Sequence, residues 1–110
     1  MDEDGWVAAT NVDELADHKP VQLRVGDVEV LIVRNGAELF TIGNRCTHQQ
    51  APLHRGPVKF SGSLRTVRCP LHGSTFDLAD GRVIQGPALQ AVPSYETRVV
   101  DGVVQIRPRG

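Results

Sequence analysis

The sequence has no long hydrophobic run. No apolar stretch in its 110 residues approaches the ~20 residues that cross a membrane. Three acidic residues follow Met1 and lead into no apolar segment, so the start does not have the form of a secretory signal. These two absences predict a cytoplasmic protein that is not inserted in a membrane.

The sequence also lacks an excess of charge of either sign, with 12 Lys and Arg against 13 Asp and Glu. The formal net charge is −1, which argues against a nucleic-acid-binding protein. The acids are unevenly placed, because residues 39–76 contain no Asp or Glu but hold three of the four histidines. Such a gap arises by chance in short sequences, or it marks a basic rim that steers an acidic partner. The basic residues of this stretch are Arg45, Arg55, Lys59, Arg65 and Arg68.

Several functional motifs are missing as well. The chain has no glycine-rich phosphate loop, no Ser-His-Asp set and no alternation of basic and aromatic residues of the kind that binds single-stranded nucleic acid. It has no internal repeat, low-complexity tract or interdomain linker. We therefore expect one domain, residues 1–110, with a modest hydrophobic core.

What the chain does contain is a paired Cys–His pattern. Its only two cysteines are each followed by a histidine, as Cys46-Thr47-His48 and, after twenty residues, as Cys69-Pro70-Leu71-His72. Such ligands suit iron, zinc or copper, and suit magnesium or calcium poorly. The spacing alone leaves three interpretations open: a Cys46–Cys69 disulfide, a zinc site, or an iron–sulfur cluster with mixed ligation. Common zinc motifs group like ligands together, whereas here each loop holds one of each, which favours the cluster.

The residues that flank this pattern carry a family resemblance. Residues 46–53, CTHQQAPL, and residues 69–77, CPLHGSTFD, closely resemble the two cluster-binding loops of Rieske [2Fe–2S] proteins. The similarity extends to Asp80-Gly81 and to residues 86–88, and it covers nearly the whole chain. One departure is a gap between His48 and Cys69 that is a few residues longer than usual. We expect the surplus to form an extended hairpin around residues 58–64.

The resemblance implies a set of ligands. Cys46 and Cys69 would hold one iron of a Rieske-type [2Fe–2S] cluster, and His48 and His72 would hold the other. Ser74 matches a position whose hydroxyl donates to a bridging sulfide in some Rieske proteins; the alternative is an ordinary turn hydroxyl. A proline-bearing loop covers the cluster in this family. In this chain Pro87 would shield it from water, unless it is a simple turn proline.

Three further positions bear on the reduction potential. Phe76 stands where the highest-potential relatives carry a tyrosine hydroxyl, and Ala51 and Leu71 stand where those relatives carry two disulfide-bonded cysteines. Histidine ligation makes each state of the centre two charges less negative than four cysteines would, which raises the potential above that of a four-cysteine ferredoxin. The resemblance therefore implies a potential in the lower half of the Rieske range.

The pattern of the whole chain predicts an all-β fold. Many short strands separated by glycine turns are typical of a small antiparallel β-sandwich or barrel. One brief helical turn is expected after Asn11, with Asn11 as its cap. Strands are expected at residues 6–9, 21–25, 28–33, 39–42, 58–60, 63–68, 75–78, 82–84, 95–100 and 103–107.

By this resemblance the protein is a soluble Rieske-type ferredoxin, a one-electron carrier without catalytic residues. A flavin-dependent ferredoxin reductase and a terminal oxygenase would dock at the cluster tip of a monomer. The alternative is a Rieske-like small subunit of a larger redox enzyme, such as an assimilatory nitrite reductase. The oxygenase itself is disfavoured because its mononuclear iron needs two more histidines and a carboxylate. Only His18 and His54 remain, and both are expected to be surface residues.

Overall fold

The computed structural model describes residues 5–109, so the acidic start of the chain lies outside the described residues. Within this range the fold is all-β and antiparallel, as expected, with no helix of the length and hydrophobicity of a transmembrane segment. The strands are β1 Val7–Asn11, β2 Val21–Val25, β3 Val28–Asn35, β4 Glu38–Gly43, β5 Val58–Ser61, β6 Leu64–Arg68, β7 Thr75–Asp77, β8 Val83–Gln85, β9 Ser94–Val100 and β10 Val103–Pro108. The two single-turn 3₁₀ helices are η1 Val12–Glu14 and η2 Leu53–Arg55.

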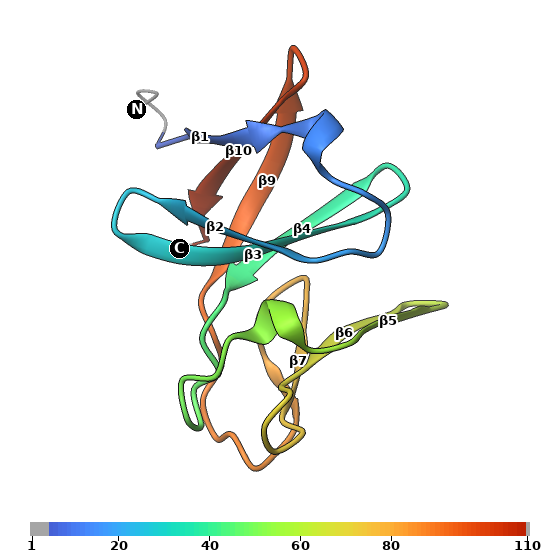
Figure 1. Cartoon of the computed structure of the whole chain (residues 1–110), viewed down its shortest axis with the longest axis vertical. Coiled ribbons are helices and arrows are strands. Elements are labelled where there is room, and N and C mark those ends of the chain that lie inside the picture. The colour runs from blue at the N-terminus through green and yellow to red at the C-terminus, as the bar shows by residue number, and fades with distance from the viewer. Residues whose placement is uncertain (1–4, 110) are drawn as a thin grey trace.

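Six strands form a nearly closed barrel. Their order is β1-β10-β9-β4-β3-β2, and tight hairpins join β2 to β3, β3 to β4 and β9 to β10 (Figure 1). The β9–β10 turn has positive φ at Asp101 and Gly102, which matches the twist of the strands that it joins. Strand β9 returns from the other half of the molecule and pairs with β4, Thr41 opposite Tyr95. Turn chemistry accounts for the three hairpins, whereas the β4–β9 and β1–β10 pairings join segments that are distant in the chain.

The other four strands form a separate sheet of order β5-β6-β7-β8. With the loops around it, this sheet makes up the lower half of Figure 1, which we call the loop unit (residues 44–93). The β5–β6 hairpin, with Gly62 at its turn, lies where the extended hairpin was expected. Its Phe60 stacks on His18, with ring centroids 4.9 Å apart, and contacts Phe40 at 5.9 Å. The hairpin is therefore held against the barrel by aromatic contacts.

Strand β3 is buried on both faces. The sequence predicts simple alternation for residues 28–33, but Val30, Leu31, Ile32 and Val33 are all fully buried. Leu31 and Val33 belong to a core shared with the loop unit, which includes both cysteines. Val30 and Ile32 belong to the core inside the barrel. The continuous apolar run reflects this position between two cores.

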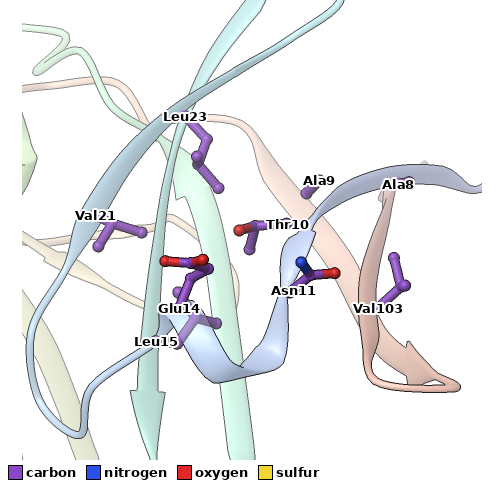
Figure 2. A pocket seen from close by; sticks show the side chains of 9 residues that line it. All are labelled: Ala8, Ala9, Thr10, Asn11, Glu14, Leu15, Val21, Leu23 and Val103. Carbon is purple, nitrogen blue, oxygen red and sulfur yellow. The ribbon is translucent and has the colours of Figure 1, made fainter.

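The 3₁₀ helix η1 begins where expected, but the side chain of Asn11 makes no capping hydrogen bond, so that detail of the prediction is wrong. Beside it, β1 and β2 are the two unpaired edges of the barrel sheet, and a hollow of about 480 Å³ lies between them. Figure 2 shows that small and aliphatic side chains such as Ala9 and Leu23 line it. Glu14 is its one titratable lining residue. The hollow lies in the barrel and lacks the paired Cys–His chemistry found elsewhere.

Candidate metal centre

Three loops gather at the end of the loop unit that lies away from the barrel (Figure 1). The first (residues 44–54) carries Cys46 and His48, the second (residues 69–74) carries Cys69 and His72, and the third spans residues 86–93. Side chains that are far apart in the sequence therefore meet at one tip.

The first loop is a closed hairpin whose base is held by the main chain. The N–H of Cys46 donates to the carbonyl of Ala51 (2.9 Å), and the N–H of Gln50 donates back to the carbonyl of Cys46 (2.7 Å). Gln50 takes a positive φ of 61° to close the turn. The result is a buried cysteine at the base and an exposed histidine, His48, near the turn.

The second loop has a similar form. The N–H of Cys69 donates to the carbonyl of Ser74 (2.7 Å), and the N–H of Gly73 donates to the carbonyl of Cys69 (3.2 Å). Gly73 has a φ of 81°, and a side chain there would lie 2.9 Å from Nη2 of Arg68. Cys69 is buried while His72 is exposed, so this loop repeats the arrangement of the first.

The third loop is bonded to the other two. The N–H of Ala88 donates to the buried Oγ of Ser74 (2.9 Å), and Oγ1 of Thr47 donates to the carbonyl of Gln90 (2.6 Å). Pro87 lines a hollow of about 330 Å³ together with His48. The third loop therefore borders the tip, as the resemblance implies, although Pro87 itself is exposed.

The four sequence-predicted ligands meet as two like pairs. The cysteines are buried free thiols close enough for their side chains to interact, so the disulfide alternative does not describe this structure. The rings of His48 and His72 lie edge to face, with centroids 5.3 Å apart. Among residues 5–109, no three Cys, His, Asp or Glu side chains converge as ligands of one ion would. Two pairs fit a two-iron cluster, in which each iron takes two protein ligands, better than they fit one zinc ion.

The surroundings of Cys69 on balance raise the pKa of its thiol, although they include donors that favour the thiolate. Burial raises the pKa of its thiol, and the backbone N–H groups of Leu71 and His72 act in the opposite direction. The neighbouring Cys46 raises the pKa further. A metal-bound thiolate keeps its charge in a buried site, where such N–H donors stabilise it. The donor chemistry therefore fits an iron–sulfur centre.

One group of polar residues beneath the first loop was not predicted. Asn44 is fully buried and bonds to Glu29 and to His54. His54 is half-buried rather than a plain surface histidine. The one sequence feature that could have indicated this buried polar group is the polar Asn44 directly after the apolar end of β4.

The basic stretch is only partly a free basic rim. Oε1 of Glu29, on β3, lies 3.1 Å from Nη2 of Arg45. Oδ1 of Asp77 lies 3.5 Å from Nε of Arg65. Among residues 5–109 no ion pair involves the other three basic residues of the stretch. These are Arg55, Lys59 and Arg68, all of them exposed.

Comparison with known proteins identifies this arrangement. The family described as the Rieske [2Fe-2S] domain matches residues 5–96. The chain is 31% identical over 101 residues to the anthranilate 1,2-dioxygenase ferredoxin subunit of Burkholderia cepacia, covering 92% of this chain and 90% of that one.

Solved structures agree with the sequence match. The ferredoxin of carbazole 1,9a-dioxygenase from Nocardioides aromaticivorans IC177 superposes with a TM-score of 0.85 and 29% identity, over 94% of this chain and 98% of that one. A candidate NADH-dependent nitrite reductase small subunit from Mycobacterium tuberculosis superposes with a TM-score of 0.82 and 28% identity, over 96% and 95%.

Fold and site together define an iron–sulfur electron-transfer domain. More specifically, the chain belongs to the Rieske [2Fe–2S] domain family, and its cofactor is a Rieske-type [2Fe–2S] cluster, which confirms the resemblance seen in the sequence.

Proposed function

We propose that this protein is the ferredoxin component of an aromatic-ring oxygenase system, carrying single electrons from a flavin-dependent reductase to a terminal oxygenase. The main support is the meeting of a buried cysteine pair and an exposed histidine pair at one tip. The curated relative of similar length, 31% identical, is itself a dioxygenase ferredoxin subunit.

In this proposal Cys46 and Cys69 bind one iron, and His48 and His72 bind the other. The bound cluster supplies reversible one-electron chemistry. The protein keeps water from the buried cysteines and presents the exposed histidine edges to a partner, which makes those edges the route for the electron. The loops are tied by main-chain hydrogen bonds, so the ligands move little when the charge changes.

Ser74 and Pro87 support the centre. The oxygen of the Ser74 hydroxyl already accepts the N–H of Ala88, so its own hydrogen is free to donate to a bridging sulfide. Pro87 forms one wall beside His48 and limits the access of water. Because no tyrosine hydroxyl or disulfide is present at the positions of Phe76, Ala51 and Leu71, we expect a potential in the lower half of the Rieske range. A redox titration tests this, and a value near the top of the range contradicts it.

Partner docking would use the tip and the adjoining face of the four-stranded sheet. Leu71 and Leu89 are 56% and 94% exposed beside the histidines, which gives the tip an apolar contact surface. Next to it a hollow of about 480 Å³ is lined by Lys59 and Arg68 and by the partly exposed Leu64. This combination fits a partner surface with acidic and apolar side chains. We further propose that the protein acts as a monomer.

Analysis of iron, acid-labile sulfide and visible absorbance tests the cofactor assignment. Substitution of any one of the four proposed ligands should abolish stoichiometric cluster binding. Full cluster retention in such a variant would refute that residue's role.

The cytoplasmic location stays a prediction.

Reconstitution with a reductase and an oxygenase tests the carrier role. Arg68→Glu should slow electron transfer at low salt, and the difference should shrink at high salt because screening shortens to about 10 Å at 0.1 M. Arg24→Glu, on exposed β2 in the barrel, is the control and should have little effect. Equal rates for both variants at all salt concentrations would refute the docking surface.

A second function is a small subunit of a nitrite reductase. The structural match to a candidate subunit of that kind supports it. Stable co-purification with a large catalytic subunit would favour this function, whereas free exchange between reductase and oxygenase favours the ferredoxin.

A further inference from the structure

Asn44 occupies the joint between the barrel and the loop unit. It directly follows β4 and is two residues from Cys46, where the chain leaves the barrel sheet for the first loop (Figure 1). It is fully buried, although it is polar. Buried polar groups are stable only when they are hydrogen-bonded, so the partners of Asn44 show what it holds together.

Every polar group of Asn44 is engaged. Its side-chain Oδ1 accepts the backbone N–H of His54 (2.8 Å), and its Nδ2 lies 2.9 Å from the ring Nδ1 of His54 and donates to Oε2 of Glu29 (2.7 Å). Its backbone N–H donates to the carbonyl of Glu29 (3.1 Å), and its carbonyl accepts the N–H of Leu53 (2.7 Å). One residue thus connects β3 of the barrel to η2 at the far end of the first loop.

The orientation of the Asn44 amide follows from these partners. Reversal of the amide would set Oδ1 against the Glu29 carboxylate and Nδ2 against the N–H of His54. In the observed orientation Nδ2 donates to Nδ1 of His54, so the ring carries its hydrogen on Nε2. The hydrogen bond from Asn44, and then Arg45, lower the pKa of Glu29, which keeps this acceptor ionised.

We propose that Asn44 is a positioning residue for the cluster: through Glu29 and His54 it fixes the first ligand loop on the barrel. This inference rests on the proposed ligands in that loop. With the amide removed, the two ends of the loop lose their shared anchor while their main-chain bonds remain. The loop then loosens and water reaches the cluster more easily. Water favours the more negative, reduced state, so the potential rises.

The test compares Asn44→Ala with Thr41→Val in the holoprotein. Thr41 is also a buried polar residue of the β4 segment, and its hydroxyl bonds to Thr97 in the barrel (2.8 Å), so its loss removes a buried hydrogen bond without touching the loop. Asn44→Ala should release iron about tenfold faster or more than the wild type. It should also raise the potential and broaden the electron paramagnetic resonance lines. Thr41→Val should leave the potential and the lines unchanged.

Two further variants keep the test decisive if Asn44→Ala does not fold. Asn44→Asp preserves the acceptor for the N–H of His54 but replaces the donor to Glu29 by a second carboxylate, so it should release iron faster, while its added negative charge opposes the rise in potential. His54→Ala removes only the ring contact and should give a smaller change of the same sign as Asn44→Ala. Wild-type potential and iron release in both variants, or identical behaviour of Asn44→Ala and Thr41→Val, would overturn the inference. If the wild type binds no cluster, the proposed function fails instead, so the two failures are distinguishable.

Discussion

The barrel and the loop unit are built on different principles, although they share strand β3. The barrel consists of six strands joined mainly by tight hairpins around an apolar core. The loop unit contains the three-residue strands β7 and β8 and long loops, and its core includes both cysteines. Metal binding commonly contributes to the folding free energy of such a unit. The barrel therefore serves as the scaffold, and we expect the stability of the loop unit to depend both on its packing against the barrel and on its cluster.

The largest expected effect comes from Gly56, which lies between η2 and β5 in the chain and packs against the end of β6. A Cβ at this position would be 1.7 Å from the carbonyl oxygen of Arg68, directly before Cys69. Gly56→Ala must therefore push the two segments apart and misplace the second loop. We expect nearly complete loss of iron and sulfide, measured on the purified protein, while the barrel keeps its circular dichroism signal.

Gly36→Ala is the matched control in the barrel. Gly36 has a φ of 63°, and a methyl group at this position would have no neighbouring atom within 4 Å, so only backbone strain of about 1 kcal/mol is added. This variant should keep its cluster. A fully loaded Gly56→Ala protein would contradict the proposed tight packing of the loop unit.

The features that the sequence predicted and those that it did not also differ between the barrel and the loop unit. The barrel hairpins were predictable because alternation and turns such as Asn35-Gly36 are local signals. The four proposed ligands came from the paired Cys–His pattern together with the family resemblance of its flanks, because the spacing alone left a disulfide and a zinc site open. The contact of His18 with Phe60 and the hydrogen bonds of Asn44 depend on segments that are distant in the chain, and no local pattern encodes them. Burial of β3 on both faces was missed because it requires a second unit to cover the barrel.

The next prediction compares substitutions on the two faces of β3. Leu31 and Ile32 are adjacent and fully buried, but Leu31 faces the loop-unit core and Ile32 faces the barrel core. Truncation of either to Ala should cost about 2–5 kcal/mol of unfolding free energy. Only Leu31→Ala should also release iron faster, in kinetics measured with a chelator. Equal release from both variants would show that the two cores act as one.

A smaller effect is expected at Ser74, within the loop unit. Ser74→Ala removes the proposed donor to a bridging sulfide, a bond of about 1 kcal/mol that favours the reduced state. For a one-electron couple this lowers the potential by about 40 mV. Thr75→Val is the control, since its hydroxyl donates to the carbonyl of Gly73 (3.2 Å) and leaves Ser74 in place. An unchanged potential in Ser74→Ala would identify Ser74 as an ordinary turn hydroxyl.

The smallest effect is confined to alkaline pH and belongs to the barrel. Tyr95, the only tyrosine, is 8% exposed in the barrel core, and burial raises the pKa of its phenol. Above about pH 10 the unfolded chain loses this proton while the folded chain retains it. The free energy of unfolding should therefore fall as the pH rises from there towards the folded pKa, because the folded state binds more protons.

Tyr95→Phe removes this group and should abolish that alkaline decline, measured by urea unfolding at a series of pH values. The reduction potential should not respond to this substitution, because Tyr95 belongs to the barrel core and not to the core that includes the two cysteines. Tyr95→Phe should therefore leave the pH dependence of the potential unchanged. If the variant retains the alkaline loss of stability, the decline originates outside the barrel core, and the buried Tyr95 does not account for it.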